Sequence, residues 1–205
     1  EALATAPELA GWDGLGLAVQ AYQKRALPVI DWLADLAHRS GRRLMVRLCK
    51  GAYWDAEIKA AQERGLRDYP VFTRKVNSDL SYLACARRLF ADPAAFYPAF
   101  ATHNAHTLAA VAELAISAGG HDDWEYQRLH GMGEELYGQI VGDDRWGRAC
   151  RVYAPVGSHE DLLAYLVRRL LENGANSSFV NRIADADLPI EALIADPVAK
   201  AARQS

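Results

Sequence analysis

A short stretch before residue 173 combines two arginines, a tyrosine and a glutamate at helical spacing. Tyr165, Arg168, Arg169 and Glu172 stand at i, i+3, i+4 and i+7, so they share one face of a helix. Two guanidinium groups on one face can bind a carboxylate or a phosphate through paired hydrogen bonds, and Glu172 can orient them. The same pattern is also typical of a solvated helix face with an ordinary Arg–Glu pair. This stretch alone leaves both interpretations open.

The elements that must position this face are strands alternating with helices. Five short segments are predicted as strands, at 15–22, 43–49, 97–102, 125–129 and 150–155, and the first of them is an apolar run that suits a buried strand. Helices are predicted at 27–38, 71–90, 105–118 and 134–141. Gly41 ends the first of these helices, and Ser158 caps a further helix that carries the two arginines. This alternation predicts parallel βαβ units, in either a barrel or a doubly wound sheet.

Polar residues gather where these strands end, and this favours a barrel. The strand-end residues are Gln20, Arg47, Lys50, Thr102, His103, Asn104, Gln127, His130 and Tyr153. In a (β/α)8 TIM-type barrel, the loops after the strands build one site at the carboxyl ends. No G-x-G-x-x-G pattern follows any strand, which argues against a dinucleotide-binding sheet. We therefore predict an α/β chain that holds about the last five βα units of such a barrel.

Composition excludes several classes of protein. The chain has 205 residues, of which 51% are hydrophobic, so it can form a sizeable core. Its formal net charge is −3 and no basic run occurs, which argues against nucleic-acid binding. No apolar segment is long enough to span a bilayer, and no signal peptide opens the chain. Cys49, Cys85 and Cys150 are far apart, as expected of reduced, buried thiols in a cytosolic protein.

The charges at the end of the second strand allow two interpretations. Arg47 and Lys50 lie at and just beyond a buried segment, where a charge is costly unless an anionic group is bound or paired there. A flavin suits them, because its reduced ring is anionic and its pyrophosphate is doubly charged. A structural ion pair with Asp55 or Glu57 is the alternative.

The other candidate residues carry weaker signals. His103 and His106 are spaced like metal ligands, but a zinc site needs a third ligand and carboxylates nearby, so we expect no metal. Hydrogen bonding to a cofactor or to the backbone suits them better. Tyr53, Trp54 and Phe179 could stack on a planar ring or simply pack against their neighbours.

Several long motifs, in matching order, resemble proline dehydrogenase. They are Arg47-Leu-Cys-Lys50-Gly-Ala-Tyr53-Trp54-Asp, Phe100-Ala-Thr-His-Asn104-Ala-His, Leu129-His-Gly-Met-Gly-Glu134, Tyr153-Ala-Pro-Val-Gly157, Tyr165-Leu-Val-Arg-Arg-Leu-Leu-Glu172-Asn-Gly-Ala-Asn176-Ser-Ser-Phe179 and the tail Asn181-Arg-Ile-Ala-Asp185. The chain resembles most the bifunctional bacterial branch of this family, in which an aldehyde dehydrogenase follows. The resemblance runs through nearly the whole chain.

This resemblance implies a distorted (β/α)8 barrel that holds FAD and oxidises L-proline to Δ1-pyrroline-5-carboxylate, with electrons passed to a quinone. It further implies a cytoplasmic protein that can associate peripherally with the inner membrane face. Residues 1–182 would be the C-terminal part of the barrel and 183–205 a tail toward the next domain. Because the family also uses a lysine and an aspartate on earlier strands, we expect the 205 residues alone to be inactive.

The resemblance also assigns roles to individual residues. Arg168 and Arg169 would clamp the proline carboxylate, and Glu172 would hold them in place. The substrate ring would be walled by Tyr53, Leu129, Tyr153 and Tyr165. FAD would be contacted by Gln20, Arg47, Lys50, Gly51, Trp54, Thr102, His103, Asn104, Gln127 and Phe179, with Arg47 near the flavin N5 edge.

Two rival functions remain at this point. One is another flavin-dependent TIM-barrel oxidoreductase, which would need a slot for a larger substrate than the paired arginines suit. The other is a flavin- or imino-acid-binding fragment without activity.

Overall fold

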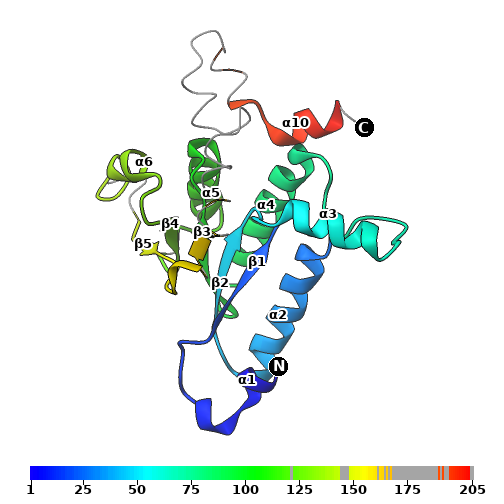
Figure 1. The fold of residues 1–205 in the computed structure, drawn as a ribbon. Helices are drawn as coiled ribbons and strands as arrows, with labels where there is room; N and C mark the ends of the chain where they lie inside the picture. Colours follow the sequence, from blue (N-terminus) through cyan, green and yellow to red (C-terminus); the bar gives the residue numbers. More distant parts are fainter. Residues whose placement is uncertain are drawn as a thin grey trace.

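The computed structural model describes residues 1–120, 122–143, 148–160, 162–163, 165, 167, 189, 191 and 194–203. Its strands are β1 (Gly16–Gln20), β2 (Leu44–Cys49), β3 (Phe96–Ala101), β4 (Glu125–Leu129) and β5 (Cys150–Tyr153). Its helices are α1 (Ala2–Thr5), the 3-10 helix η1 (Pro7–Leu9), α2 (Ala26–Ser40), α3 (Trp54–Glu63), α4 (Lys75–Phe90), α5 (Ala105–Ser117), α6 (Glu134–Gly138) and α10 (Pro197–Ala202). Figure 1 shows how they are arranged.

The five strands form one parallel sheet in the order β1-β2-β3-β4-β5. Each strand pairs with the next one along the chain, and the connections carry helices. A doubly wound sheet reverses its strand order at a switch point, and this sheet has no such reversal among its described strands. The predicted α/β class is confirmed, and the sequential order is that of successive units of a (β/α)8 barrel.

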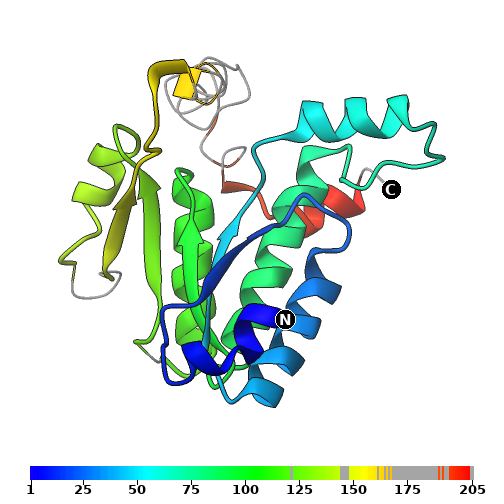
Figure 2. The same ribbon diagram turned by 60° about the horizontal axis from the view of Figure 1, so that its bottom comes forward.

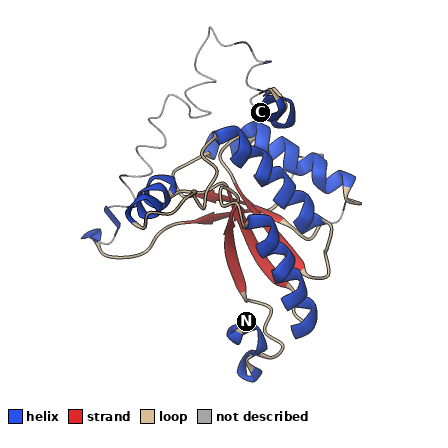
Figure 3. Cartoon of the chain, turned by 90° about the vertical axis from the view of Figure 1, so that its right-hand side faces the viewer, coloured by secondary structure: helices blue, strands red, loops and turns tan. Residues whose placement is uncertain are grey.

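One face of this sheet is apolar and covered by helices. Figure 2 shows α2, α4 and α5 running alongside the strands, and in Figure 3 long helices lie next to the strands drawn in red. Val46, Leu48 and Phe100 point to this face and are fully buried in the core. Because side chains alternate between faces along a strand, every second residue of these strands belongs to the core.

An aromatic cluster fills the core between β3, β4 and the helices. The Trp124 ring lies edge-on to Phe90, Phe100 and Tyr126, with ring centroids 5.6, 5.7 and 4.8 Å apart. Edge-to-face contacts at such distances are favourable for aromatic rings. This cluster fixes β3 and β4 against α4, and so fixes the sheet from which the inner face projects.

Helix α2 forms where the sequence predicted it. Ile30, Leu33, Ala34 and Ala37 make its buried stripe. Gly41 follows in the left-handed conformation, with φ of +63°, and ends the helix as expected.

Several element boundaries differ from the prediction. Helix α3 was not predicted, because it buries only Ala61 and so carries no apolar stripe. Helix α4 begins at Lys75 rather than at residue 71, since Val71 is extended and bridges to Gln23. Helix α6 ends at Gly138, three residues early. Helices α1 and α10 also escaped prediction, and α10 packs against α4.

The cysteines are free thiols, but only one is buried. Cys85 is fully buried, whereas Cys49 and Cys150 are half-buried, so the prediction of three buried thiols was wrong for two of them. Among the described residues, no helix is both long and apolar enough to cross a membrane.

Candidate functional site

The face of the sheet opposite the helices carries small and polar side chains. Arg47 on β2 lies level with Ala99 on β3, which lies level with Glu125 on β4. Gln127 is aligned with Arg151 on β5 in the same way. Register partners in a parallel sheet project from the same face, so these residues share one surface. We call it the inner face.

Arg47 is held on the inner face by two neighbours. Its Nε donates to Oε1 of Gln127 over 2.5 Å, and its guanidinium carbon lies 4.5 Å from the centre of the Tyr153 ring. Gln127 is 1% exposed. Three residues named from the sequence, on β2, β4 and β5, are therefore brought together at one place.

Glu125 extends this cluster, although the sequence did not point to it. Its two oxygens accept from Arg151 Nε and Nη2 at 2.7 and 2.8 Å, and Oε1 also accepts from Gln127 Nε2 at 2.7 Å. Burial raises the pKa of Glu125, but the hydrogen bonds from Arg151 and Gln127 lower it by more, so its pKa lies below the ordinary value. Glu125 is thus an ionised, buried carboxylate.

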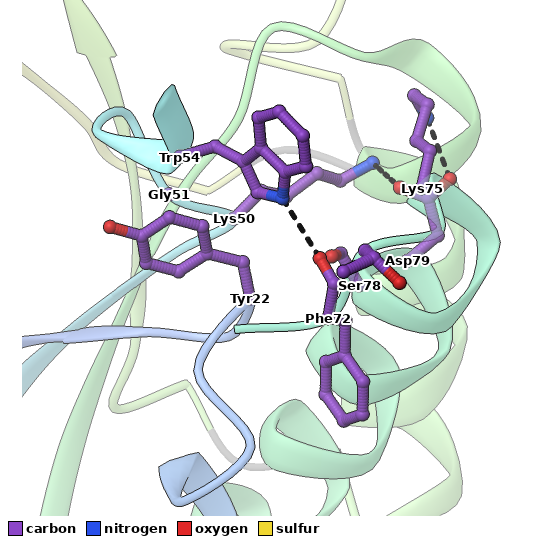
Figure 4. A pocket seen from close by; sticks show the side chains of 9 residues that line it. Tyr22, Lys50, Gly51, Trp54, Phe72, Lys75, Ser78 and Asp79 are labelled. Carbon is purple, nitrogen blue, oxygen red and sulfur yellow. Dashed lines mark hydrogen bonds and ion pairs between the residues drawn. The ribbon is translucent and has the colours of Figure 1, made fainter. Parts of the chain in front are cut away.

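A pocket of about 350 Å³ opens beside the end of β2 (Figure 4). Lys50, Gly51 and Trp54 line it, and these are three of the predicted cofactor residues. The remaining lining residues come from the end of β1 and the segment entering α4: Tyr22, Phe72, Thr73, Lys75, Ser78 and Asp79. Gly51 has φ of +135°, and a Cβ there would meet the Tyr22 ring at 2.4 Å, so only glycine fits.

Lys50 makes an ion pair, but with a residue that the sequence did not suggest. Its Nζ lies 2.5 Å from Oδ1 of Asp79, and Lys75 Nζ lies 2.6 Å from the other oxygen. Burial lowers the pKa of Lys50, although Asp79 opposes this shift. The alternative pairing of Lys50 with Asp55 or Glu57 was wrong, because its ion-pair partner is Asp79 of α4.

Trp54 and Tyr22 are aromatic residues that line this pocket. The Trp54 indole donates to the Phe72 carbonyl at 3.0 Å, and Tyr53 and Trp54 are 44% and 41% exposed. The Tyr22 hydroxyl is buried and has no hydrogen-bond partner among the residues that the structure describes. Burial, with the nearby Glu57 carboxylate, raises the pKa of Tyr22 to about 12.

The Thr102–Asn104 segment has structural roles that the structure shows directly. Asn104 caps α5 by accepting from the Thr107 N–H at 2.9 Å. His103 Nε2 accepts from the Leu129 N–H at 3.1 Å, and the Thr102 carbonyl accepts from the Tyr137 hydroxyl at 2.8 Å. No group of three or more metal-binding side chains occurs among the described residues.

The structure describes only some of the residues that were expected to contact the substrate. Leu129 and Tyr153 are register partners at the ends of β4 and β5, so they lie side by side on the inner face. Tyr165 is half-buried in a helical segment after Ser158. Gln20 lies at the end of β1, where its Oε1 faces the Ala52 N–H at 3.4 Å. Four predicted residues lie outside the described ones: Arg168, Arg169, Glu172 and Phe179.

The chain belongs to the proline dehydrogenase family, whose model matches residues 1–182. The bifunctional protein PutA of Salmonella typhimurium is 65% identical over 201 residues, which cover 97% of this chain. Proline dehydrogenase 1 of Bacillus subtilis is 31% identical over 173 residues, covering 82% of this chain and 48% of that protein. The crystal structure of a Bradyrhizobium japonicum proline utilization A variant matches with a TM-score of 0.89 and 60% identity over 97% of this chain.

The chain is short compared with these relatives. It spans 15% of the Salmonella typhimurium protein and 20% of the Bradyrhizobium japonicum chain. The predicted resemblance to the bifunctional bacterial branch is confirmed by these matches.

Proposed function

We propose that these residues form part of the FAD-binding barrel of a bifunctional proline dehydrogenase that oxidises L-proline to Δ1-pyrroline-5-carboxylate. The observation that carries the proposal is the placement of Arg47 on Gln127 and Tyr153, which joins side chains of β2, β4 and β5 on one face of the sheet, with Tyr153 at the carboxyl end of its strand. The carboxyl ends of parallel strands are where barrels of this class build their sites. Family membership then specifies the substrate.

The pocket beside β2 has the chemistry that a flavin nucleotide needs. Lys50, Lys75 and Asp79 together carry an excess of one positive charge, and they lie at the N-terminus of the 16-residue helix α4. Cationic side chains at a helix N-terminus favour a phosphate. The Tyr22 ring lines the same pocket, and its buried hydroxyl has no hydrogen-bond partner among the described residues. The residues present therefore fit FAD, with Lys50 and Lys75 toward its phosphates.

Bound FAD supplies the hydride acceptor, and the chain supplies orientation and charge. Arg47 places a cation on the inner face, where it can stabilise negative charge that develops on a reduced ring. Leu129 and Tyr153 present an apolar wall beside it. Arg168 and Arg169 would hold the substrate carboxylate with two planar forks, and Glu172 would orient them. Hydride leaves easily only from the neutral amine, so the site should favour that form of proline.

Other properties of the proposal rest on the resemblance and on the length of the relatives. We propose that an aldehyde dehydrogenase follows in the full-length protein, with 183–205 leading toward it. We also propose that electrons pass to a quinone, and that the cytoplasmic protein reaches it by peripheral association with the inner membrane face.

Anaerobic addition of L-proline to the purified full-length protein tests the proposal. Bound FAD should lose its visible absorption as fast as the enzyme turns over, and one Δ1-pyrroline-5-carboxylate should form for each FAD that is reduced. Flavin that stays yellow with proline would support a non-catalytic binder instead. Bleaching only by a larger reductant would support another flavin-dependent barrel enzyme.

Steady-state kinetics tests the carboxylate clamp separately. Arg168→Met and Arg169→Met should each raise the apparent KM for proline by roughly one hundredfold, since losing one fork costs about 2–4 kcal/mol. Glu172→Ala should act in the same direction and more mildly. FAD content should stay nearly intact in all three variants. A KM close to the wild-type value in both arginine variants would contradict the clamp.

A further inference from the structure

Glu125 has no role in the proposed function, yet it is the one charged residue that is buried among the described part of the chain, with 3% exposure. It projects from β4 on the inner face, two residues before Gln127. Its carboxylate accepts from Arg151 at 2.7 and 2.8 Å and from Gln127 Nε2 at 2.7 Å. The Tyr97 hydroxyl faces its second oxygen at 3.5 Å.

These contacts leave the Gln127 amide a single orientation. An ionised carboxylate only accepts hydrogen bonds, so the Gln127 NH₂ group must face Glu125. A guanidinium only donates, so the Gln127 oxygen must face Arg47. Turning the amide over would set two acceptors against each other on one side and two donors on the other. Ionised Glu125 therefore fixes the orientation of the Gln127 amide, and the amide in turn presents its oxygen to Arg47. We call this chain of hydrogen bonds, from Glu125 through Gln127 to Arg47, the relay.

The strand between them allows Arg47 to reach Gln127. Strands β2 and β4 are two positions apart in the sheet, a separation of roughly 10 Å. The β3 residues that face this gap are Ala99 and Ala101, which are 0% and 8% exposed. Their methyl groups leave room for the arginine side chain to cross β3, which a larger side chain would fill.

We infer that Glu125 is a positioning residue, which fixes Arg47 through Gln127 in the direction that the bound flavin requires. The inference rests on the proposed function, because it assumes that Arg47 faces a flavin. Without the carboxylate, the Gln127 amide can turn over, and the Arg47 Nε loses its acceptor. Among the described residues, the structure shows no other hydrogen bond that holds this guanidinium.

The test is the midpoint potential of the bound flavin in full-length Glu125→Gln protein. The potential should fall, with the reduction equilibrium about tenfold less favourable, or about 30 mV for a two-electron couple. The sign is informative, because removing a negative charge without moving Arg47 would raise the potential. Asp123→Asn is the matched control, since Asp123 also pairs with an arginine, Arg43 at 2.9 Å, but stands outside this relay. It should leave the potential unchanged.

A double-mutant cycle separates positioning from general disturbance. In the Arg47→Met background, Glu125→Gln should produce no further fall, because there is no guanidinium left to position. If Glu125→Gln does not fold, Gln127→Leu keeps the Glu125–Arg151 pair, breaks the relay and should give the same fall. An unchanged or raised potential in the first folded variant overturns the inference, as does an equal fall in the Arg47→Met background.

A ligand-free crystal structure of Glu125→Gln distinguishes failure of this inference from failure of the proposed function. In that structure, the Arg47 side chain should no longer contact Gln127 Oε1. This result is expected whether or not the wild-type protein binds a flavin. If the wild-type protein bound no flavin, the proposed function would fail, while displaced Arg47 would still support the relay. Arg47 unmoved from Gln127 would overturn the role of Glu125.

Discussion

The two faces of the same sheet differ in almost every property except their backbone. On the helix-covered face, Val46, Leu48 and Phe100 are fully buried and pack into an aromatic core. On the inner face, Arg47 and Gln127 belong to a chain of hydrogen bonds that runs across four strands to Arg151. The alternation of side chains along a strand produces both surfaces from one set of residues.

Because of this difference, adjacent residues of one strand should affect different properties, one the stability of the fold and the next the function of the site. Burial of apolar area drives the packing on the helix-covered face, and its loss costs free energy of unfolding. The inner face holds charged side chains whose interactions are directional. Substituting one of them should change the properties of a bound ligand more than the free energy of unfolding. Neighbouring residues on one strand therefore make matched test pairs.

The largest expected effect is on the helix-covered face. Phe100→Ala should lower the free energy of unfolding by about 3–5 kcal/mol, because Phe100 is fully buried and contacts Phe90 and Trp124. Phe100→Leu keeps most of the volume and should cost much less. Urea unfolding of the full-length protein, followed by tryptophan fluorescence, measures the loss. Equal stability of the alanine and leucine variants would show that the aromatic cluster contributes little.

An intermediate effect is expected at Asp79, which pairs with both Lys50 and Lys75. Burial raises the pKa of Asp79, but Lys50 and Lys75 lower it by more, so the pKa is depressed in the folded state. A carboxylate with a depressed folded pKa stabilises the protein above its unfolded pKa, about 3.9, and that contribution is lost as pH falls further.

Asp79→Asn should therefore cost about 1–3 kcal/mol at pH 7, and the difference from wild type should shrink below about pH 4. Denaturant unfolding across this pH range measures it. Asp68→Asn, which breaks an exposed pair with Lys24, is the control and should change stability very little. A stability difference that does not depend on pH would refute the assignment to Asp79 ionisation.

The smallest effect is expected at Asn104, which the sequence placed in the cofactor site and the structure places at the cap of α5. Asn104→Ala should cost about 1 kcal/mol of unfolding free energy, whereas Asn104→Ser keeps a capping oxygen and should cost little. Thermal unfolding of both variants measures the cap. FAD affinity of the serine variant shows whether Asn104 also contacts the cofactor. Alanine and serine variants of equal stability would contradict the capping role.

Much of the fold follows from patterns that the sequence displays. All five strands were predicted close to their observed places, and α2 was recognised from its apolar stripe ending at Gly41, because burial imposes a helical period on that stripe. Helix α3 could not be found in this way, since it buries one residue and exposes the rest. The position of α4 was obscured because Val71 is apolar but belongs to an extended bridge.

Several residues of the site could be predicted from the sequence, but the residues that they contact could not. The motif resemblance pointed to Arg47, Lys50 and Gln127, which the structure places at the inner face and its adjoining pocket. Their contacts depend on sheet register, which a single sequence does not show. A period of two in Glu125-x-Gln127 and Arg151-x-Tyr153 was the available signal for the missed carboxylate and its arginine partner. No local signal joined Lys50 to Asp79, 29 residues along the chain.

The most direct test of the whole account compares adjacent residues that face opposite ways. Arg47→Met should lower the flavin midpoint potential in the full-length protein and slow reduction by proline, with unfolding free energy changed by less than about 1 kcal/mol. Val46→Ala should cost about 2 kcal/mol of stability and leave the potential unchanged. A wild-type potential in Arg47→Met would contradict the claim that the inner face of this sheet holds the flavin.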